Sequence, residues 1–132
     1  MATAGETRFM EMVFPDLVNH YGTLFGGHAL RLMDMAAFVA ASRYTRQTVV
    51  TAAMDRVDFH SPVRQGQLLD VEGSVTATGK TSVTVEVTLH AEDLLTGERR
   101  LCTRGKFVLV AVDEGGNPVS LALDPTSPET RP

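Results

Sequence analysis

Residues 19–27, NHYGTLFGG, and the apolar run HALRLMDMAAFVAASRY at 28–44 decide the fold of this chain. Ala, Leu and Met dominate the run and are good helix formers, so the sequence predicts one long helix that begins at the glycine pair. At about 100° per residue, one helix face is expected to pack on a sheet. That face holds Leu30, Met33, Ala37, Ala40, Ala41 and Tyr44.

The opposite side of the predicted helix is also apolar, because it carries Leu32, Met35 and Val39. A helix that is apolar nearly all round is usually buried on more than one side. A chain of 132 residues has little left to cover the second side. We therefore expect another subunit to pack there.

Asp34 falls at the edge of the sheet-facing stripe. Aspartate is seldom buried without a partner, and a carboxylate at an apolar border is a candidate general base or nucleophile. The alternative is a structural role, in which Asp34 pairs with Arg31 or with an arginine of another subunit. The helical pattern alone leaves both interpretations open.

Gly26 and Gly27 would place the unpaired N–H groups and partial positive charge of a helix N-terminus where another molecule can approach. Such a site can bind a phosphate or polarise a carbonyl group. A plain tight turn is the simpler alternative. Asp34 lies roughly 10 Å further along the axis than Gly27, so one carbonyl could reach both only if the side chain leans back or a second subunit bridges the gap.

The rest of the chain reads as strands separated by turns. The clearest period-two pattern lies at 83–90, where Val or Leu alternates with polar residues. Short turns between consecutive strands predict an antiparallel sheet with the helix on one face, an α+β architecture. We expect one domain over 1–123 and a flexible tail at 124–132. The predicted strands are 8–14, 47–59, 68–78, 81–91 and 99–113.

Composition excludes several functions. The net charge of −4 argues against nucleic-acid binding, and neither a transmembrane run nor a secretory signal is expected. The single cysteine, Cys102, cannot form an internal disulfide and suits a cytoplasmic protein, in which it would be a core residue. His20 and His28 lack a cysteine or carboxylate at metal-ligand spacing, so no metal site is expected.

The combined motifs resemble the acyl-CoA hydrolase family of hot-dog-fold thioesterases. The resemblance rests on Asn19, Gly22, the 26–27 glycine pair, and 33–37 (MDMAA), with further matches at 58–66, 79–82 and 110–118. It spans roughly residues 8–121. It implies a hot-dog fold, in which a curved antiparallel sheet of about five to six strands surrounds one long helix. Dimers with sheets paired edge to edge would assemble into a hexamer (a trimer of dimers) or a tetramer.

The resemblance also implies a reaction, the hydrolysis of an acyl-CoA to a carboxylic acid and CoA. CoA is then part of the substrate, and no separate cofactor is expected. Asp34 matches the family's catalytic carboxylate, acting as general base or nucleophile. Asn19 matches a loop asparagine that faces the aspartate of the other subunit. The backbone N–H at or next to Gly27 would polarise the thioester carbonyl.

Substrate contacts are implied on three segments. Phe25 stands where many relatives carry His. Arg64 could contact a CoA phosphate or could equally be a solvated turn residue. Lys106, inside an apolar strand, could reach a strand edge or a phosphate bound by a neighbour. The implied substrate-binding residues are Phe25, Gly26, Arg64, Gly66, Lys80, Thr81 and Ser82.

Two other functions remain as alternatives. A non-catalytic acyl-CoA-binding module, such as a sensor, would use the same fold, although the sequence has no spare segment for DNA binding. A hydratase would need a different loop, because Asp16 and His20 lack the accompanying Asn-Pro element. The sequence does not define the preferred acyl chain.

Overall fold

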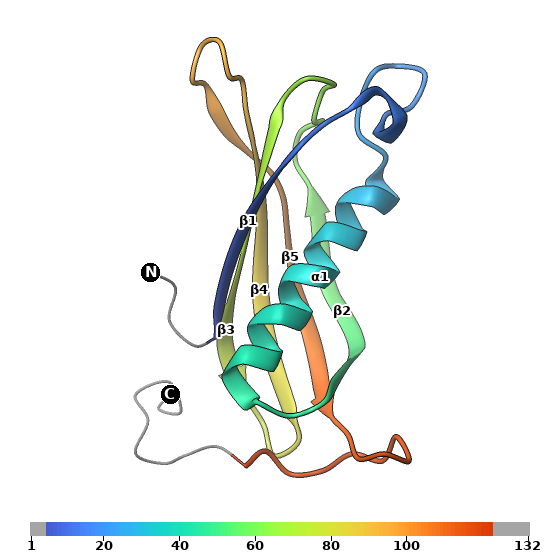
Figure 1. Ribbon diagram of the computed structural model, residues 1–132, viewed down its shortest axis with the longest axis vertical. Helices are drawn as coiled ribbons and strands as arrows, with labels where there is room; N and C mark the ends of the chain where they lie inside the picture. The colour runs from blue at the N-terminus through green and yellow to red at the C-terminus, as the bar shows by residue number, and fades with distance from the viewer. Residues whose placement is uncertain (1–4, 123–132) are drawn as a thin grey trace.

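The computed structural model describes residues 5–122, and in this range one long helix crosses one face of a five-stranded sheet (Figure 1). The predicted helix and all five predicted strands are present, with bounds shifted by at most two residues. The elements are β1 (Glu6–Met12), the short 3₁₀ turn η1 (Pro15–Leu17), α1 (Gly26–Thr45), β2 (Val49–Phe59), β3 (Leu68–Thr78), β4 (Ser82–Glu92) and β5 (Arg99–Ala111).

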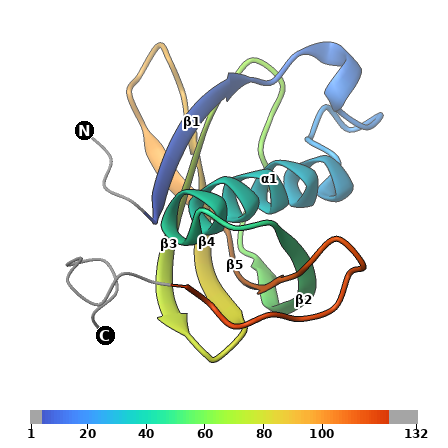
Figure 2. The ribbon, with the colours of Figure 1, turned by 60° about the horizontal axis from the view of Figure 1, so that its bottom comes forward.

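The strand order is β1-β3-β4-β5-β2, and every neighbouring pair is antiparallel. A tight turn joins β3 to β4 and a short loop joins β4 to β5, whereas α1 carries the chain from one sheet edge at β1 to the other at β2. Figure 2 shows the sheet curving around the helix. The predicted α+β arrangement, an antiparallel sheet around one helix, is confirmed.

The core lies between α1 and the concave face of the sheet. In β4, Val83, Val85, Val87 and Leu89 are fully buried, as their alternation predicts. The helix packs closely on β3 at Gly73, where an added Cβ would lie 3.3 Å from the carbonyl oxygen of Ala36. A Cβ at this position would require the helix backbone to move by a few tenths of an ångström.

The predicted helix face is partly wrong. Leu30 and Tyr44 are only half-buried, whereas Leu32, assigned to the opposite side, is 1% exposed. The reason is compositional, because a helix rich in Ala, Leu and Met on every side has no sharp apolar stripe. The buried helix residues are Ala29, Leu32, Met33, Ala36, Ala37, Ala40, Ala41 and Thr45.

The sheet face turned away from α1 is polar, which explains Lys106. Because strand residues alternate between faces, Lys106 points outward while Phe107 fills the core. In register, Lys106 lies between Glu86 of β4 and Asp55 of β2. The lysine therefore belongs to a row of charged residues on the outer face.

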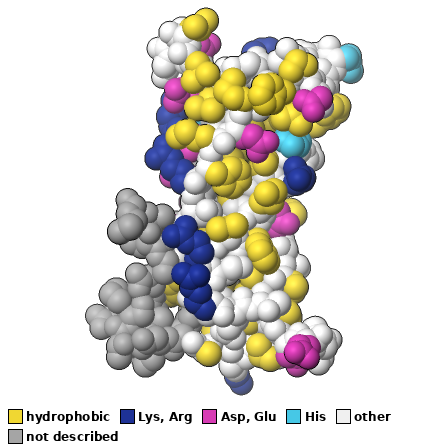
Figure 3. Space-filling model, viewed as in Figure 1, with side chains coloured by type: hydrophobic (Ala, Val, Ile, Leu, Met, Phe, Trp, Pro, Cys, Tyr) yellow, Lys and Arg dark blue, Asp and Glu magenta, His cyan; other side chains and the backbone are white. Residues whose placement is uncertain are grey.

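A large apolar surface is left uncovered along α1 and β2 (Figure 3). Met35, Phe38 and Val39 on the helix are 47%, 48% and 38% exposed, and Met54 on the helix-facing side of β2 is 49% exposed. Contiguous exposed apolar surface usually marks an interaction site. We call these four residues the helix–β2 apolar face.

Candidate active site

Asp34 lies beside the open edge of the sheet, in contact with β2. The helix packs mainly on β1, β3 and β4, so its β2 side is less covered. There the hydroxyl of Thr51 donates a hydrogen bond to Asp34 Oδ1 at 2.7 Å. Among the described residues, none donates to Asp34 Oδ2, which leaves one carboxylate oxygen available to another molecule.

The N-terminus of α1 is open. Phe25 is the N-cap residue, and it provides no side-chain cap. Its carbonyl accepts from His28 N and Ala29 N at 3.0 and 3.1 Å. Within residues 5–122, the amides of Gly26 and Gly27 donate to no acceptor. These free N–H groups are suited to an anion or a polarised carbonyl.

The two glycines border empty space. A Cβ on Gly27 would meet nothing within 4 Å, and one on Gly26 would only touch the ring of Phe59 at 3.7 Å. The fold of a single chain therefore does not require glycine at 27. This absence of contact is what the approach of a second molecule to the backbone would need.

Asn19 forms an Asx turn in the loop before α1. Its Oδ1 accepts from Tyr21 N at 2.9 Å, from Thr23 N at 3.2 Å and from Thr23 Oγ1 at 3.1 Å. The turn fixes the orientation of the side chain. Its amide nitrogen makes no hydrogen bond to any residue that the structure describes, so it remains a possible donor.

A hollow of about 340 Å³ opens beside the helix N-terminus. Gly26 and Ala29 of α1 and Phe59 of β2 line it. Its lining is mainly apolar, with the open helix terminus at its rim. The full lining is Leu24, Gly26, Ala29, Phe59, His60, Ser61, Pro62, Val63 and Thr103.

One chain does not bring all of the predicted substrate-binding residues together. Phe25, Gly26, Arg64 and Gly66 lie at the end of the molecule where α1 begins, whereas residues 80–82 lie at the opposite end, in the β3–β4 turn and at the start of β4 (Figure 1). Gly66 has φ +87°, so its turn itself favours glycine. A single ligand could contact both groups only across a subunit boundary.

Thr51 joins the candidate site, although the sequence did not predict it there. A threonine in a strand rich in Val and Thr looks like an ordinary strand former. Its proximity to Asp34 becomes visible only once β2 lies beside the helix. The exposed side of α1 indicates that a strand residue could contact Asp34, but no local motif identifies Thr51 as that residue.

Other kinds of site lack support in the described part of the chain. No group of three or more His, Cys, Asp or Glu residues there is arranged to hold a metal ion. No helix within residues 5–122 is long and apolar enough to cross a membrane. Cys102 is fully buried, as predicted for a core residue.

A curved antiparallel sheet wrapped around one long helix is the arrangement of a hot-dog protein. The model of the thioesterase superfamily matches residues 21–98. The chain belongs to this superfamily, and the family resemblance noted above is confirmed.

Individual relatives and solved structures of similar sequence are named as acyl-CoA hydrolases or thioesterases. The uncharacterized acyl-CoA thioester hydrolase YkhA of Bacillus subtilis is 39% identical over 122 residues, covering 86% of this chain and 71% of the relative. An apo-hexameric acyl-CoA thioesterase has a TM-score of 0.87 and 42% identity, covering 96% of this chain and 81% of that one. The Staphylococcus aureus acyl-CoA hydrolase, solved with butyryl-CoA, CoA and CoA disulfide, has a TM-score of 0.85 and 29% identity, with 91% and 73% coverage.

The S. aureus enzyme has also been solved as three alanine variants, of an asparagine, an aspartate and a threonine. In its numbering, the aspartate follows the asparagine by 15 residues, and the threonine follows the aspartate by 17. The same two intervals separate Asn19, Asp34 and Thr51 in this chain.

Proposed function

We propose that the protein is an acyl-CoA thioesterase, which hydrolyses an acyl-CoA to a free carboxylic acid and CoA. The observation that carries the proposal is the 2.7 Å hydrogen bond between Thr51 and Asp34, at the edge of an exposed apolar face. The Asn19–Asp34–Thr51 intervals match those of the variants made in the S. aureus enzyme. The names of the relatives point to the same substrate class.

In the proposed mechanism, Asp34 is either the general base for a water molecule or the nucleophile. Thr51 holds Oδ1, so that Oδ2 faces the reacting group. The free amides of Gly26 and Gly27 stabilise the negative charge that develops on the thioester oxygen. The mainly apolar hollow next to Gly26 would take part of the substrate and limit the access of bulk water.

The working site is proposed to lie between two chains. Asp34 is eight residues into the helix that starts at Gly26, about 12 Å along its axis. Asn19 lies in the loop beyond the helix start, and its printed bonds are local. A second subunit on the helix–β2 apolar face would bring the Asn19 of one chain to the Asp34 of the other. Residues 80–82 of one chain would join Arg64 and Gly66 of its partner in the same way.

The hexameric relative supports a hexamer built from such dimers, with a tetramer as the alternative. We expect the enzyme to work in the cytoplasm, where a single buried thiol such as Cys102 stays reduced.

The test is the release of free thiol from a panel of short, long and aromatic acyl-CoAs by the native protein and by Asp34→Ala. We expect release by the native protein and a loss of at least about 100-fold in kcat for the variant, because a general base or nucleophile is removed. CoA binding and the melting temperature should change little. Hydrolysis by Asp34→Ala at the native rate would refute the proposed role.

The non-catalytic alternative makes a different prediction in the same assay. A binding module would bind acyl-CoA and release no thiol from any member of the panel. A hydratase would consume an enoyl-CoA without releasing thiol.

A further inference from the structure

The loop of residues 60–67 joins β2 to β3 and supplies much of the wall of the hollow beside the helix N-terminus. Backbone hydrogen bonds tie it to the loop before α1. Leu24 N donates to Val63 O at 2.8 Å, and Gln65 N donates to Gly22 O at 3.0 Å. Because of these bonds, a displacement of the 60–67 loop would also displace the loop before α1.

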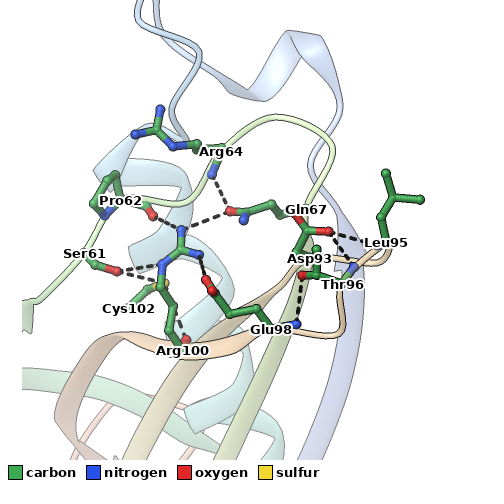
Figure 4. A network of polar contacts seen from close by, with 10 residues as sticks. All are labelled: Ser61, Pro62, Arg64, Gln67, Asp93, Leu95, Thr96, Glu98, Arg100 and Cys102. Carbon is green, nitrogen blue, oxygen red and sulfur yellow. Dashed lines mark hydrogen bonds and ion pairs between the residues drawn. The ribbon is translucent and has the colours of Figure 1, made fainter.

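Arg100 of β5 holds the 60–67 loop from below (Figure 4). Its Nε donates to Ser61 Oγ at 3.0 Å, and its Nη2 donates to Pro62 O at 2.6 Å and to Gln67 Oε1 at 3.1 Å. Gln67 Oε1 also accepts from Arg64 N at 2.9 Å. Arg100 thus links both ends of the loop to the sheet.

These partners are all neutral, which sets Arg100 apart from its neighbour Arg99. Arg99 pairs with the buried carboxylate of Asp70. The carboxylate nearest to Arg100 belongs to Glu98, which is 3.8 Å away and 71% exposed. A surface pair of this kind contributes little stability. The rigid planar fork of an arginine, in contrast, can reach several fixed acceptors at once.

Arg64 also lies in the 60–67 loop. Figure 4 shows the Arg64 guanidinium turned away from this network, and it makes no hydrogen bond or ion pair with a described residue. Its backbone is nevertheless held through Gln67 and Arg100. The Arg64 guanidinium is therefore free to bind a ligand, while the backbone of Arg64 is fixed through Gln67 and Arg100.

We propose that Arg100 is the positioning residue of the active site. By bonding Ser61, Pro62 and Gln67, it sets the place of the 60–67 loop, and through this loop the place of the Asn19 turn and of the wall of the hollow. The inference rests on the proposed thioesterase function. Arg100 itself contacts no substrate and acts through the residues that it holds.

The test compares Arg100→Met and Arg100→Lys with the control Arg104→Met, which removes an exposed arginine from the same strand. Steady-state kinetics with one good acyl-CoA are measured well below each melting temperature. For Arg100→Met we expect kcat/KM to fall on the order of 100-fold, because a displaced loop misplaces the substrate. Arg100→Lys should recover only part of this loss, and Arg104→Met should behave as native.

Amide hydrogen exchange provides a readout that does not depend on activity. In Arg100→Met, exchange should accelerate at Arg64, whose amide loses a fixed acceptor, and at Leu24, while Val85 and Val87 in the core keep their native rates. Native kcat/KM in folded Arg100→Met would overturn the proposal, and so would unchanged exchange at Arg64. A native protein that hydrolyses no acyl-CoA would refute the proposed function, while the exchange result would still decide whether Arg100 holds the loop.

Discussion

At the scale of single residues, Thr51 determines which oxygen of Asp34 is free. Its hydroxyl occupies Oδ1, and the side chain lies on an exposed strand. Thr51→Val keeps the shape and removes the bond. We expect kcat to fall roughly 10- to 100-fold because the carboxylate loses its orientation, with a change in unfolding free energy within about 0.5 kcal/mol. Kinetics and denaturant titration measure the two effects, with the exposed Thr48→Val as control.

Asp70 is a buried carboxylate on the outer face of the sheet. It is 1% exposed and accepts hydrogen bonds from Arg8 and Arg99. Burial acts to raise its pKa, but the bonds from both arginines outweigh this effect and lower it. A carboxylate with a lowered folded pKa stabilises the protein above its unfolded pKa of about 3.9, and this stability is lost as pH falls through the folded value.

Asp70→Asn should therefore lower the unfolding free energy at pH 7 by about 1–2 kcal/mol, because it weakens the charge-assisted hydrogen bonds from two arginines that are themselves partly exposed. The unfolding free energy of the native protein should also decrease more steeply below pH 4 than that of the variant. Denaturant titrations from pH 7 to pH 3 give both quantities. Equal pH dependence in the two proteins would mean that Asp70 contributes nothing through its charge.

His90 lies opposite Asp70 in the β3–β4 register. Burial and, to a smaller extent, Arg99 lower its pKa. The unfolded chain then takes up a proton near pH 6.5 before the folded protein does, so stability declines as pH falls through this value. His90→Gln should lose less stability between pH 7.5 and 5.5 than the native protein, as measured by urea titration at both pH values.

Residue types explain which parts of the site the sequence could predict. Asp34, Asn19 and the glycine pair sit in a spacing that is recognisable as a family motif. Thr51 and Arg100 do not, because their roles depend on partners far away in the chain, 17 residues away for Thr51 and 33 to 39 for Arg100. Whether the predicted residues act as proposed remains a prediction.

At the scale of elements, the contact between α1 and β3 depends on a missing side chain. A Cβ at Gly73 would approach the Ala36 carbonyl to 3.3 Å. Gly73→Ala should destabilise the protein by about 1–3 kcal/mol, because the helix must shift away from the sheet.

Gly27→Ala, at an open position, should not lower the melting temperature but should reduce kcat/KM if a substrate approaches there. Melting curves and kinetics on both variants separate packing from function.

The elements themselves were predictable because their patterns are local. The alternation in β4 and the long Ala-rich run of α1 define a strand and a helix without any knowledge of their neighbours. The rotation of the helix was not predictable in the same way, since apolar residues surround it and the sheet alone decides which of them are buried. Leu32 rather than Leu30 faces the core for this reason.

At the scale of the whole molecule, the helix–β2 apolar face predicts self-association. Phe38→Asp would place a charge in this face, and burying that charge between subunits is costly. We expect this variant to elute as a monomer in light-scattering chromatography under conditions where the native protein is a dimer or larger. Leu95→Asp, at a tip residue that is 97% exposed, is the matched control and should keep at least a dimer.

The separation of Asn19 and Asp34 along the chain has a consequence for mixtures of defective proteins. In a two-fold dimer, each proposed site takes its asparagine from one chain and its aspartate from the other. A dimer of one Asn19→Ala chain and one Asp34→Ala chain would then concentrate both defects in one site and leave the other intact. Two preparations that are each inactive should regain about a quarter of the native activity when they are unfolded together and refolded at equal amounts. An organism that carries two such alleles would, by the same reasoning, retain part of the enzyme's activity.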